Sequence, residues 1–234
     1  ELDDIVQMPA GSQLAVIDIS VRSQPKLIES VDVGLNPEHL SISPDGAYLT
    51  VNLNEPGKEL LIVELQPDGR LGKRSYVSMQ LDGTREDNQT AIWHPSGQYL
   101  AITQDQIGNH LSHPRFTSDG RFLLVPDLKW SRYPSQTLNF LLNPLGEMIA
   151  VQFDPEAESP AKVVSRVDVG LSPEGFALSP NNELIVTVNM RRTYLPSFLP
   201  AWRGKPYSSL SLIQFNALTG QLNTIEEYGF EGLL

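Results

Sequence analysis

The chain has 234 residues, of which 40% are hydrophobic and 19% charged, and it contains no cysteine. This composition is typical of a soluble globular protein and excludes disulfides, zinc–thiolate sites and thiol catalysis. The 17 basic and 28 acidic residues give a formal net charge of −11. No broad basic surface is therefore expected, and nucleic acid is not an expected partner. No apolar run approaches the roughly 20 residues of a transmembrane helix, and residues 1–4 lack the basic start of a signal peptide.

An internal duplication organises the chain. Residues 11–19, 30–38 and 43–46 recur, in the same order and at a nearly constant offset, as residues 146–154, 166–174 and 179–182. A match of this length indicates a repeat architecture.

Within the repeat, short runs rich in β-branched and aromatic residues are separated by turn dipeptides, which predicts β-hairpins. In chain order, the expected strands are 39–43, 48–52, 60–65, 76–80, 91–94, 99–103, 122–125, 184–189, 210–215 and 223–228. No window shows sustained helical periodicity. The prediction is an all-β fold.

Two successive hairpins make a four-stranded unit, and repeated units of this kind are the blades of a β-propeller. A β-sandwich also has many short strands, but it does not account for a motif that returns with the same internal order. We expect one propeller domain over residues 1–234, with blades at 11–35, 36–81, 90–108, 111–170 and 172–230. Several of these ranges are shorter than the roughly 40 residues of a blade. We therefore expect a complete propeller of six or seven blades, with segments missing from the sequence.

Residues 36–52 and 112–127 resemble the repeat of the lactonase-like, or Tyr-Val-Thr-Asn-repeat, β-propellers. At the level of blades the resemblance covers essentially the whole chain. It implies the propeller fold but no single activity, because the family includes lactone hydrolases acting on phosphogluconolactone, surface-layer proteins and propellers with no assigned reaction. Relatives are often exported, so the resemblance implies the periplasm or the cell exterior, with the cytoplasm as the alternative.

Three charged residues occupy one equivalent position of the repeat, directly after a proline at the start of an inner strand. They are Glu38, Arg115 and Glu174. We expect them to point towards a shared axis on one face of the ring, where arginine can bind a carboxylate or phosphate bidentately. Solvated ion pairs between blades are the alternative.

His113 and Arg115 are the catalytic candidates. The resemblance implies a histidine and an arginine near the substrate, which would make His113 the general base and Arg115 the electrophile. A structural role beside a turn is the alternative for His113 and the expected role of His94. No metal-ligand spacing, phosphate-cradling glycine loop or haem-attachment motif occurs, so neither a metal site nor a cofactor is expected.

The segment 190–207 departs from the repeat with an insertion rich in proline, aromatic and basic residues. Its Arg191, Arg192, Trp202 and Arg203 are candidate ligand-binding residues, because tryptophan and arginine are favoured at binding hot spots. We expect this loop to act as a lid or partner platform beside the glutamates. Packing over its own blade is the alternative.

These features lead to two main functional hypotheses, beside a third in which the protein is a structural propeller of the cell surface or envelope. The first is a non-catalytic β-propeller that binds a protein partner, or a small polar or anionic ligand, on one face of the ring. The alternative is a lactone hydrolase acting on a sugar lactone at the central channel, with His113 and Arg115 in catalysis and Glu38 or Glu174 assisting. Whether the protein is an enzyme is left open by the sequence.

Overall fold

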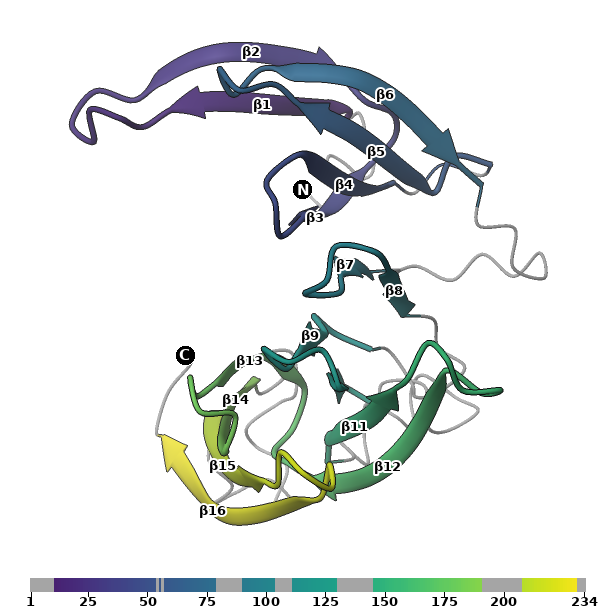
Figure 1. The fold of residues 1–234 in the computed structure, drawn as a ribbon. Helices are drawn as coiled ribbons and strands as arrows, with labels where there is room; N and C mark the ends of the chain where they lie inside the picture. Colours follow the sequence, from purple (N-terminus) through teal and green to yellow (C-terminus); the bar gives the residue numbers. More distant parts are fainter. Residues whose placement is uncertain are drawn as a thin grey trace. The chain divides into compact units, whose positions relative to one another are not determined.

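The computed structural model describes residues 11–53, 55, 57–78, 90–103, 111–129, 145–190 and 208–230. Every regular element in these ranges is a β-strand, and the strands pair into antiparallel sheets (Figure 1). This part of the chain contains no helix that could cross a membrane. The chain divides into two compact units, residues 1–102 and 103–234.

The first unit contains a two-stranded sheet (β1–β2), a four-stranded sheet (β3–β6) and a second two-stranded sheet (β7–β8). The strands are β1 (Gln13–Asp18), β2 (Lys26–Asp32), β3 (Pro37–Ile42), β4 (Tyr48–Leu53), β5 (Leu60–Leu65), β6 (Leu71–Val77), β7 (Thr90–Trp93) and β8 (Leu100–Thr103), the last ending just past the unit boundary.

The β1–β2 hairpin packs on the β3–β6 sheet. Its side chains Leu14 and Val33 share a buried cluster with Val51, Leu61 and Val63 of the larger sheet. The β7–β8 hairpin is joined to the same sheet by a hydrogen bond of 3.0 Å, donated by the backbone N–H of Ala91 to Oδ1 of Asn52. Consecutive sheets of this unit therefore pack on one another.

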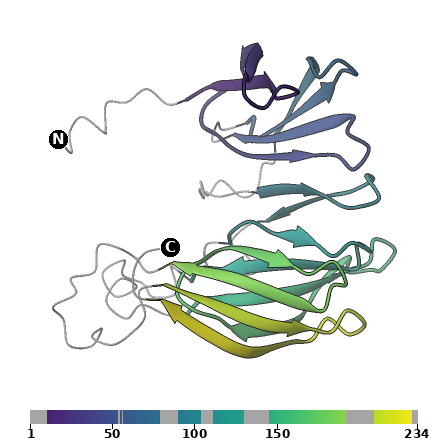
Figure 2. The same ribbon diagram turned by 90° about the vertical axis from the view of Figure 1, so that its left-hand side faces the viewer.

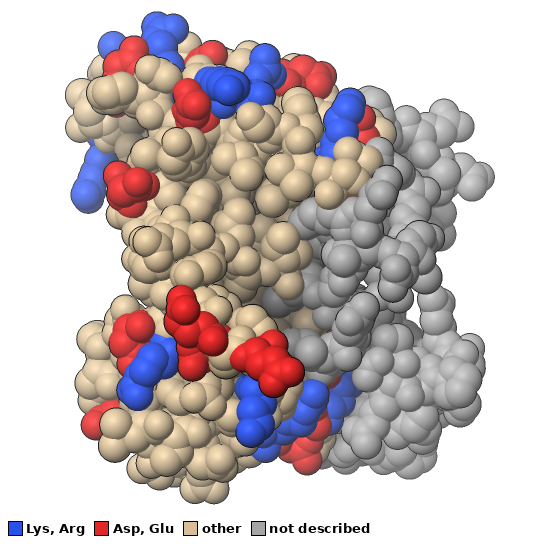
Figure 3. Space-filling model, turned by 45° about the vertical axis from the view of Figure 1, so that its right-hand side comes forward, with Lys and Arg blue, Asp and Glu red and all other residues tan. Residues whose placement is uncertain are grey.

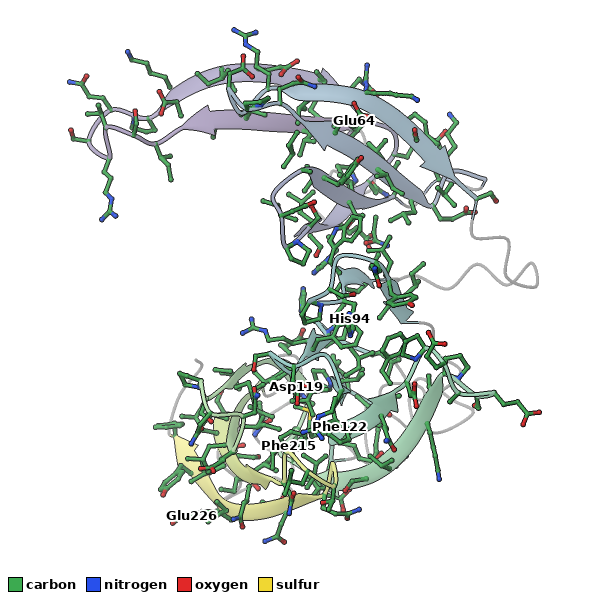
Figure 4. The ribbon with its side chains drawn as sticks, viewed as in Figure 1. Glu64, His94, Asp119, Phe122, Phe215 and Glu226 are labelled. Atoms are coloured by element: carbon green, nitrogen blue, oxygen red, sulfur yellow. The ribbon has the colours of Figure 1, made fainter. Side chains whose placement is uncertain are left out.

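The second unit contains two four-stranded sheets, ordered β12-β11-β10-β9 and β13-β14-β15-β16. The strands are β9 (Arg115–Phe116), β10 (Phe122–Asp127), β11 (Glu147–Phe153), β12 (Ala161–Asp168), β13 (Pro173–Leu178), β14 (Leu184–Met190), β15 (Ser208–Phe215) and β16 (Leu222–Phe230). Figure 2 shows their strands running alongside one another. One buried cluster fills the space between the sheets, and in it Phe122 meets Phe215 edge to face at 5.5 Å (Figure 4).

The turns that the sequence predicts are held by hydrogen bonds made by the side chain of their first residue. In the β9–β10 turn, the hydroxyl of Thr117 donates to Asp119 at 2.6 Å and accepts from the backbone N–H of Phe122 at 3.1 Å. In the β7–β8 turn, His94 accepts a hydrogen bond of 3.1 Å from the backbone N–H of Ser96. The expected turn role of His94 is confirmed, because its ring holds the chain reversal.

The sheet connections confirm the predicted fold class. The outer strand β2 leads directly into the inner strand β3 of the next sheet, and β12 leads into β13 in the same way. The repeated segments 31–34 and 167–170 therefore lie in different sheets, as expected for a propeller and not for one sheet that pairs them. The protein has an all-β fold of the β-propeller type. The single domain and the total of six or seven blades stay predictions.

Candidate functional site

Glu174 occupies a β-bulge at the start of β13. Pro173 pairs with Asn189 and Gly175 with Val188, so Glu174 is the additional residue that no residue of β14 opposes. A bulge re-aims a side chain and is over-represented beside active sites. The backbone thus gives Glu174 an orientation that a regular strand would not.

The duplication preserves this bulge in the first unit. In β3 the register shifts between Pro37 and His39, which makes Glu38 the additional residue. The residue before each proline has a left-handed backbone, with φ of 47° at Asn36 and 49° at Ser172. The two halves of the duplication therefore share a strained local geometry as well as a sequence.

Packing of β13 beside the segment that precedes β9 brings Glu174 to Ser112 and His113. The Ser112 hydroxyl donates a hydrogen bond of 2.6 Å to the backbone carbonyl of Glu174. Nδ1 of His113 lies 3.2 Å from the same carbonyl and 3.1 Å from the Ser112 hydroxyl. Three polar groups from two adjacent sheets thus meet at the start of the inner strands.

Arg115 lies on the same short segment, and its side chain is exposed. Its guanidinium carbon lies 5.8 Å from the centre of the Phe176 ring, within the range of a cation–π interaction. Arg115 forms no ion pair with any residue in the described ranges. The Phe176 ring orients the guanidinium group, and no acidic residue in the described ranges neutralises its charge.

Burial raises the pKa of Glu174, and the positive charge of His113 offsets only part of that shift. The carboxyl group therefore takes up a proton at a higher pH than an ordinary glutamate. An ionisable group with a raised pKa beside a histidine is a candidate for binding or proton transfer.

The backbone of Gly146 packs closely against Pro173, the residue before Glu174. A Cβ at residue 146 would lie 2.2 Å from Cδ of Pro173 and 3.0 Å from the backbone oxygen of Asp127. Only glycine leaves the proline ring in this position. The β10–β11 connection therefore helps to hold Pro173, and with it the start of β13.

Of the site residues predicted from the sequence, His113 contacts the backbone of Glu174, and Arg115 lies over Phe176, two residues further along β13; all are in the second unit. Glu38 is exposed on β3 of the first unit, and its convergence with the other two charges stays a prediction. The candidates of the 190–207 segment lie outside the described residues. These are Arg191, Arg192, Trp202 and Arg203.

The polar residues that end the inner strands are buried and serve the fold. Asp127 and Asn189 are each 1% exposed. Asp127 accepts a hydrogen bond from the backbone N–H of Lys129 at 2.9 Å. The Asn189 amide donates to the hydroxyls of Ser209 and Ser211 at 3.1 and 2.8 Å. These side chains are therefore not available as a ligand-binding rim.

Sequence reasoning missed the role of Lys129. The side chain is 7% exposed, and Nζ lies 2.6 Å from Glu147 and 3.4 Å from Asp168. Arg166 also contacts Glu147, at 3.1 Å. No local pattern marks this cluster, because its members come from three separate segments.

Ser112 and Phe176 were missed as well. Each lies within two residues of a predicted site residue, so inspection of the neighbours of His113 and Glu174 could have found both.

The charge distribution agrees with the acidic composition. Figure 3 shows basic and acidic side chains interspersed on the visible face, without a broad basic area among the coloured residues. Such a face offers little to a polyanion.

The sequence matches no protein-family model and no curated protein. The fold is similar to a functionally unknown protein from Desulfotomaculum acetoxidans DSM 771, with 12% identity, TM-score 0.61, and coverage of 95% of this chain and 65% of that chain. It is similar to Kuenenia stuttgartiensis hydrazine synthase, with 15% identity, TM-score 0.56, and coverage of 90% and 59%. A Pseudomonas aeruginosa periplasmic gluconolactonase has 16% identity, TM-score 0.43, and coverage of 94% and 49%.

The chain spans about half to two thirds of the length of these solved structures. Proteins described as putative 6-phosphogluconolactonases are among the structural neighbours. At such identities the first two similarities show a shared fold alone. The similarity to the gluconolactonase, with a TM-score of 0.43, supports no inference about activity. The fold is that of a β-propeller, and the candidate site lies at the start of two adjacent inner strands.

Proposed function

We propose that this β-propeller binds a small anionic ligand at the start of β9 and β13, with Arg115 as the main anchor. The exposed guanidinium over the Phe176 ring carries this proposal. Arginine recognises carboxylate and phosphate through two parallel hydrogen bonds. The aromatic ring holds the guanidinium in place before the ligand arrives, which reduces the entropic cost of binding.

The neighbouring groups suit a hydroxylated anion. The Glu174 carboxyl group, whose pKa is raised by burial, adds a hydrogen-bonding group for ligand hydroxyls. The Ser112 hydroxyl and the His113 ring add polar groups that could contact ligand hydroxyls. Sugar acids combine a carboxylate with several hydroxyls and are the class we propose.

Binding of D-gluconate and 6-phosphogluconate, measured by isothermal titration calorimetry, tests the proposal. Replacing Arg115 by glutamine should weaken binding by at least about tenfold, because a charge-assisted hydrogen bond is worth roughly 1.5–3 kcal/mol. Arg70→Gln is the matched control, since Arg70 is an exposed turn residue of the first unit and its loss changes the net charge equally. Equal affinities in the wild type and the Arg115 variant would refute the proposed site.

Lactone hydrolysis is a second candidate function, favoured by the juxtaposition of His113 with a glutamate of raised pKa. In this reaction His113 takes a proton from the attacking water, whose oxygen bonds to the lactone carbonyl carbon. Arg115 stabilises the oxyanion. The bond between that carbon and the ring oxygen then breaks, and Glu174 gives its proton to the departing oxygen. Two titratable groups with opposite tasks are a common arrangement for such chemistry.

Hydrolysis of a panel of sugar lactones, followed by acid release, tests this second function. The variants His113→Ala and Glu174→Gln should each lower the rate by about 100-fold or more, the usual contribution of a general acid or base. His94→Ala controls for loss of a histidine, because His94 holds the β7–β8 turn of the first unit. Full activity of the His113 variant would remove the catalytic assignment even if a lactone is hydrolysed.

A further inference from the structure

The ring of His113 contacts two oxygen atoms through its Nδ1 nitrogen. One is the backbone carbonyl oxygen of Glu174, at 3.2 Å, and the other is the hydroxyl oxygen of Ser112, at 3.1 Å. A neutral imidazole carries one hydrogen, on either Nδ1 or Nε2, and the nitrogen without hydrogen is the one that can take up a proton. The partners of Nδ1 therefore decide which nitrogen of His113 can act as a base.

The hydrogen of the Ser112 hydroxyl is directed at Glu174. The hydroxyl oxygen lies 2.6 Å from the Glu174 carbonyl oxygen, a distance at which a hydrogen must lie between the two atoms. A carbonyl oxygen can only accept, so this hydrogen belongs to Ser112, and a serine hydroxyl has one hydrogen to donate. Towards His113, the Ser112 oxygen can therefore only accept.

Both oxygen atoms beside Nδ1 thus act as acceptors. A hydrogen on Nδ1 is shared between them, whereas an Nδ1 without hydrogen would direct its lone pair against those of two oxygen atoms. The imidazolium form keeps the same contacts, because it also carries a hydrogen on Nδ1. His113 can therefore gain and lose a proton on Nε2 while Nδ1 keeps its hydrogen bonds.

The backbone holds all three groups in place. Ser112 is buried, and its N–H donates to the carbonyl of Pro126 at 2.9 Å, which ties the segment to β10. Pro114 restricts the backbone of the preceding residue, His113, to extended conformations. The bulge leaves Glu174 without a partner residue on β14, and its carbonyl is directed to Ser112 and His113.

We propose that Ser112 and the backbone carbonyl of Glu174 keep the hydrogen of neutral His113 on Nδ1 and thereby make Nε2 its proton acceptor. Ser112 acts through His113 and is a positioning residue. The functional meaning of this inference rests on the proposed function, which it deepens. In lactone hydrolysis Nε2 takes the proton of the attacking water, and in a site that only binds, Nε2 accepts a hydrogen bond from a ligand hydroxyl.

Nitrogen NMR of protein labelled in its histidines measures the tautomer directly, because ring nitrogens with and without hydrogen differ strongly in chemical shift. Spectra are recorded at about pH 9, well above the ordinary histidine pKa of about 6.5, and the His113 signals are those that His113→Gln removes. Wild type should carry the hydrogen on Nδ1. Ser112→Ala should raise the ratio of the Nε2–H to the Nδ1–H form by about fivefold, the effect of one ordinary hydrogen bond.

Ser118→Ala is the matched control. Ser118 lies in the turn beyond the other end of β9, where its hydroxyl accepts a hydrogen bond of 2.8 Å from the Asn182 amide. This variant therefore loses a serine hydroxyl that does not contact Nδ1 of His113, and its tautomer ratio should equal that of the wild type. The wild-type spectrum decides the tautomer even if a variant does not fold.

A neutral wild-type ring with its hydrogen on Nε2 would overturn the proposal. An unchanged ratio in Ser112→Ala would overturn the role of Ser112, because the carbonyl alone would then hold the hydrogen. These outcomes are distinct from those of the binding and activity assays. A ring with hydrogen on Nδ1, in a protein that neither binds sugar acids nor hydrolyses lactones, would refute the proposed function and leave the tautomer in place. A ring with hydrogen on Nε2 in an active protein would do the reverse.

Discussion

Replacing Gly170 by alanine is expected to lower the free energy of unfolding by about 4 kcal/mol. A Cβ at residue 170 would lie 2.4 Å from the Ser209 hydroxyl and 2.5 Å from the Asn189 amide nitrogen. These atoms belong to a buried network in which Asn189 donates to Ser209 and Ser211, and the N–H of Gly170 donates to Ser211. The added methyl group must break hydrogen bonds that water cannot replace.

Gly175→Ala is the matched control for this prediction, because nothing lies within 4 Å of a Cβ built on Gly175. It should change the free energy of unfolding by less than about 0.5 kcal/mol. Urea unfolding followed by circular dichroism compares the two variants. If Gly170→Ala unfolds at the wild-type midpoint, the packing between β12 and the β14–β15 pair is looser than these contacts indicate.

Replacing Lys129 by methionine is expected to cost about 3 kcal/mol at neutral pH. The change leaves Glu147, whose side chain is 19% exposed, with Arg166 as its remaining basic contact among the described residues. Removal of one partner of a buried ion pair is costly because the other charge has lost its hydration and its counter-charge. The double variant Lys129→Met/Glu147→Gln should recover part of the loss, since no uncompensated carboxylate is left.

The effect of Lys129→Met should depend on pH. Burial alone would raise the pKa of Glu147, but hydrogen bonds and charges from Lys129 and Arg166 outweigh it and lower the pKa below the ordinary value of 4.5. A lowered pKa in the folded state stabilises the fold above the unfolded-state pKa, and this contribution is lost as the pH falls through the folded-state pKa.

Wild type and variant should therefore differ most near pH 7 and converge in acid. Lys162→Met is the control, because Lys162 is an exposed lysine on β12. A loss of stability that is the same at pH 3 and pH 7 would show that Lys129 acts by packing and not by charge.

The sequence predicted the local structure, the turns and the hairpins, correctly. Turn pairs such as Asp45-Gly46 and Ser96-Gly97 predict hairpins because the left-handed backbone and the side-chain caps of a turn are properties of a few adjacent residues. Gly46 and Gly97 both have a φ of 72°. The duplication made the four-stranded unit visible, and that unit predicts a propeller.

The sequence also marked Glu38 and Glu174 as equivalent, and the structure adds that both are bulge residues. Their position after a proline is a sequence signal, but the orientation of a bulged side chain depends on the partner strand. For that reason the repeat could predict where these glutamates lie along the chain and could not predict which groups they meet.

Burial and long-range contact were decided by the tertiary structure alone. Asn189 and Asp127 have the residue types of a ligand-binding rim, yet both are buried because adjacent strands and connections close over them. His113 meets Glu174 across 61 residues of sequence. No local pattern encodes that distance, since it results from the packing of one whole sheet on the next. The sequence by itself thus determined the strands, the turns and the propeller class, whereas the three-dimensional packing determined which charged groups share a site and how readily Glu174 holds a proton.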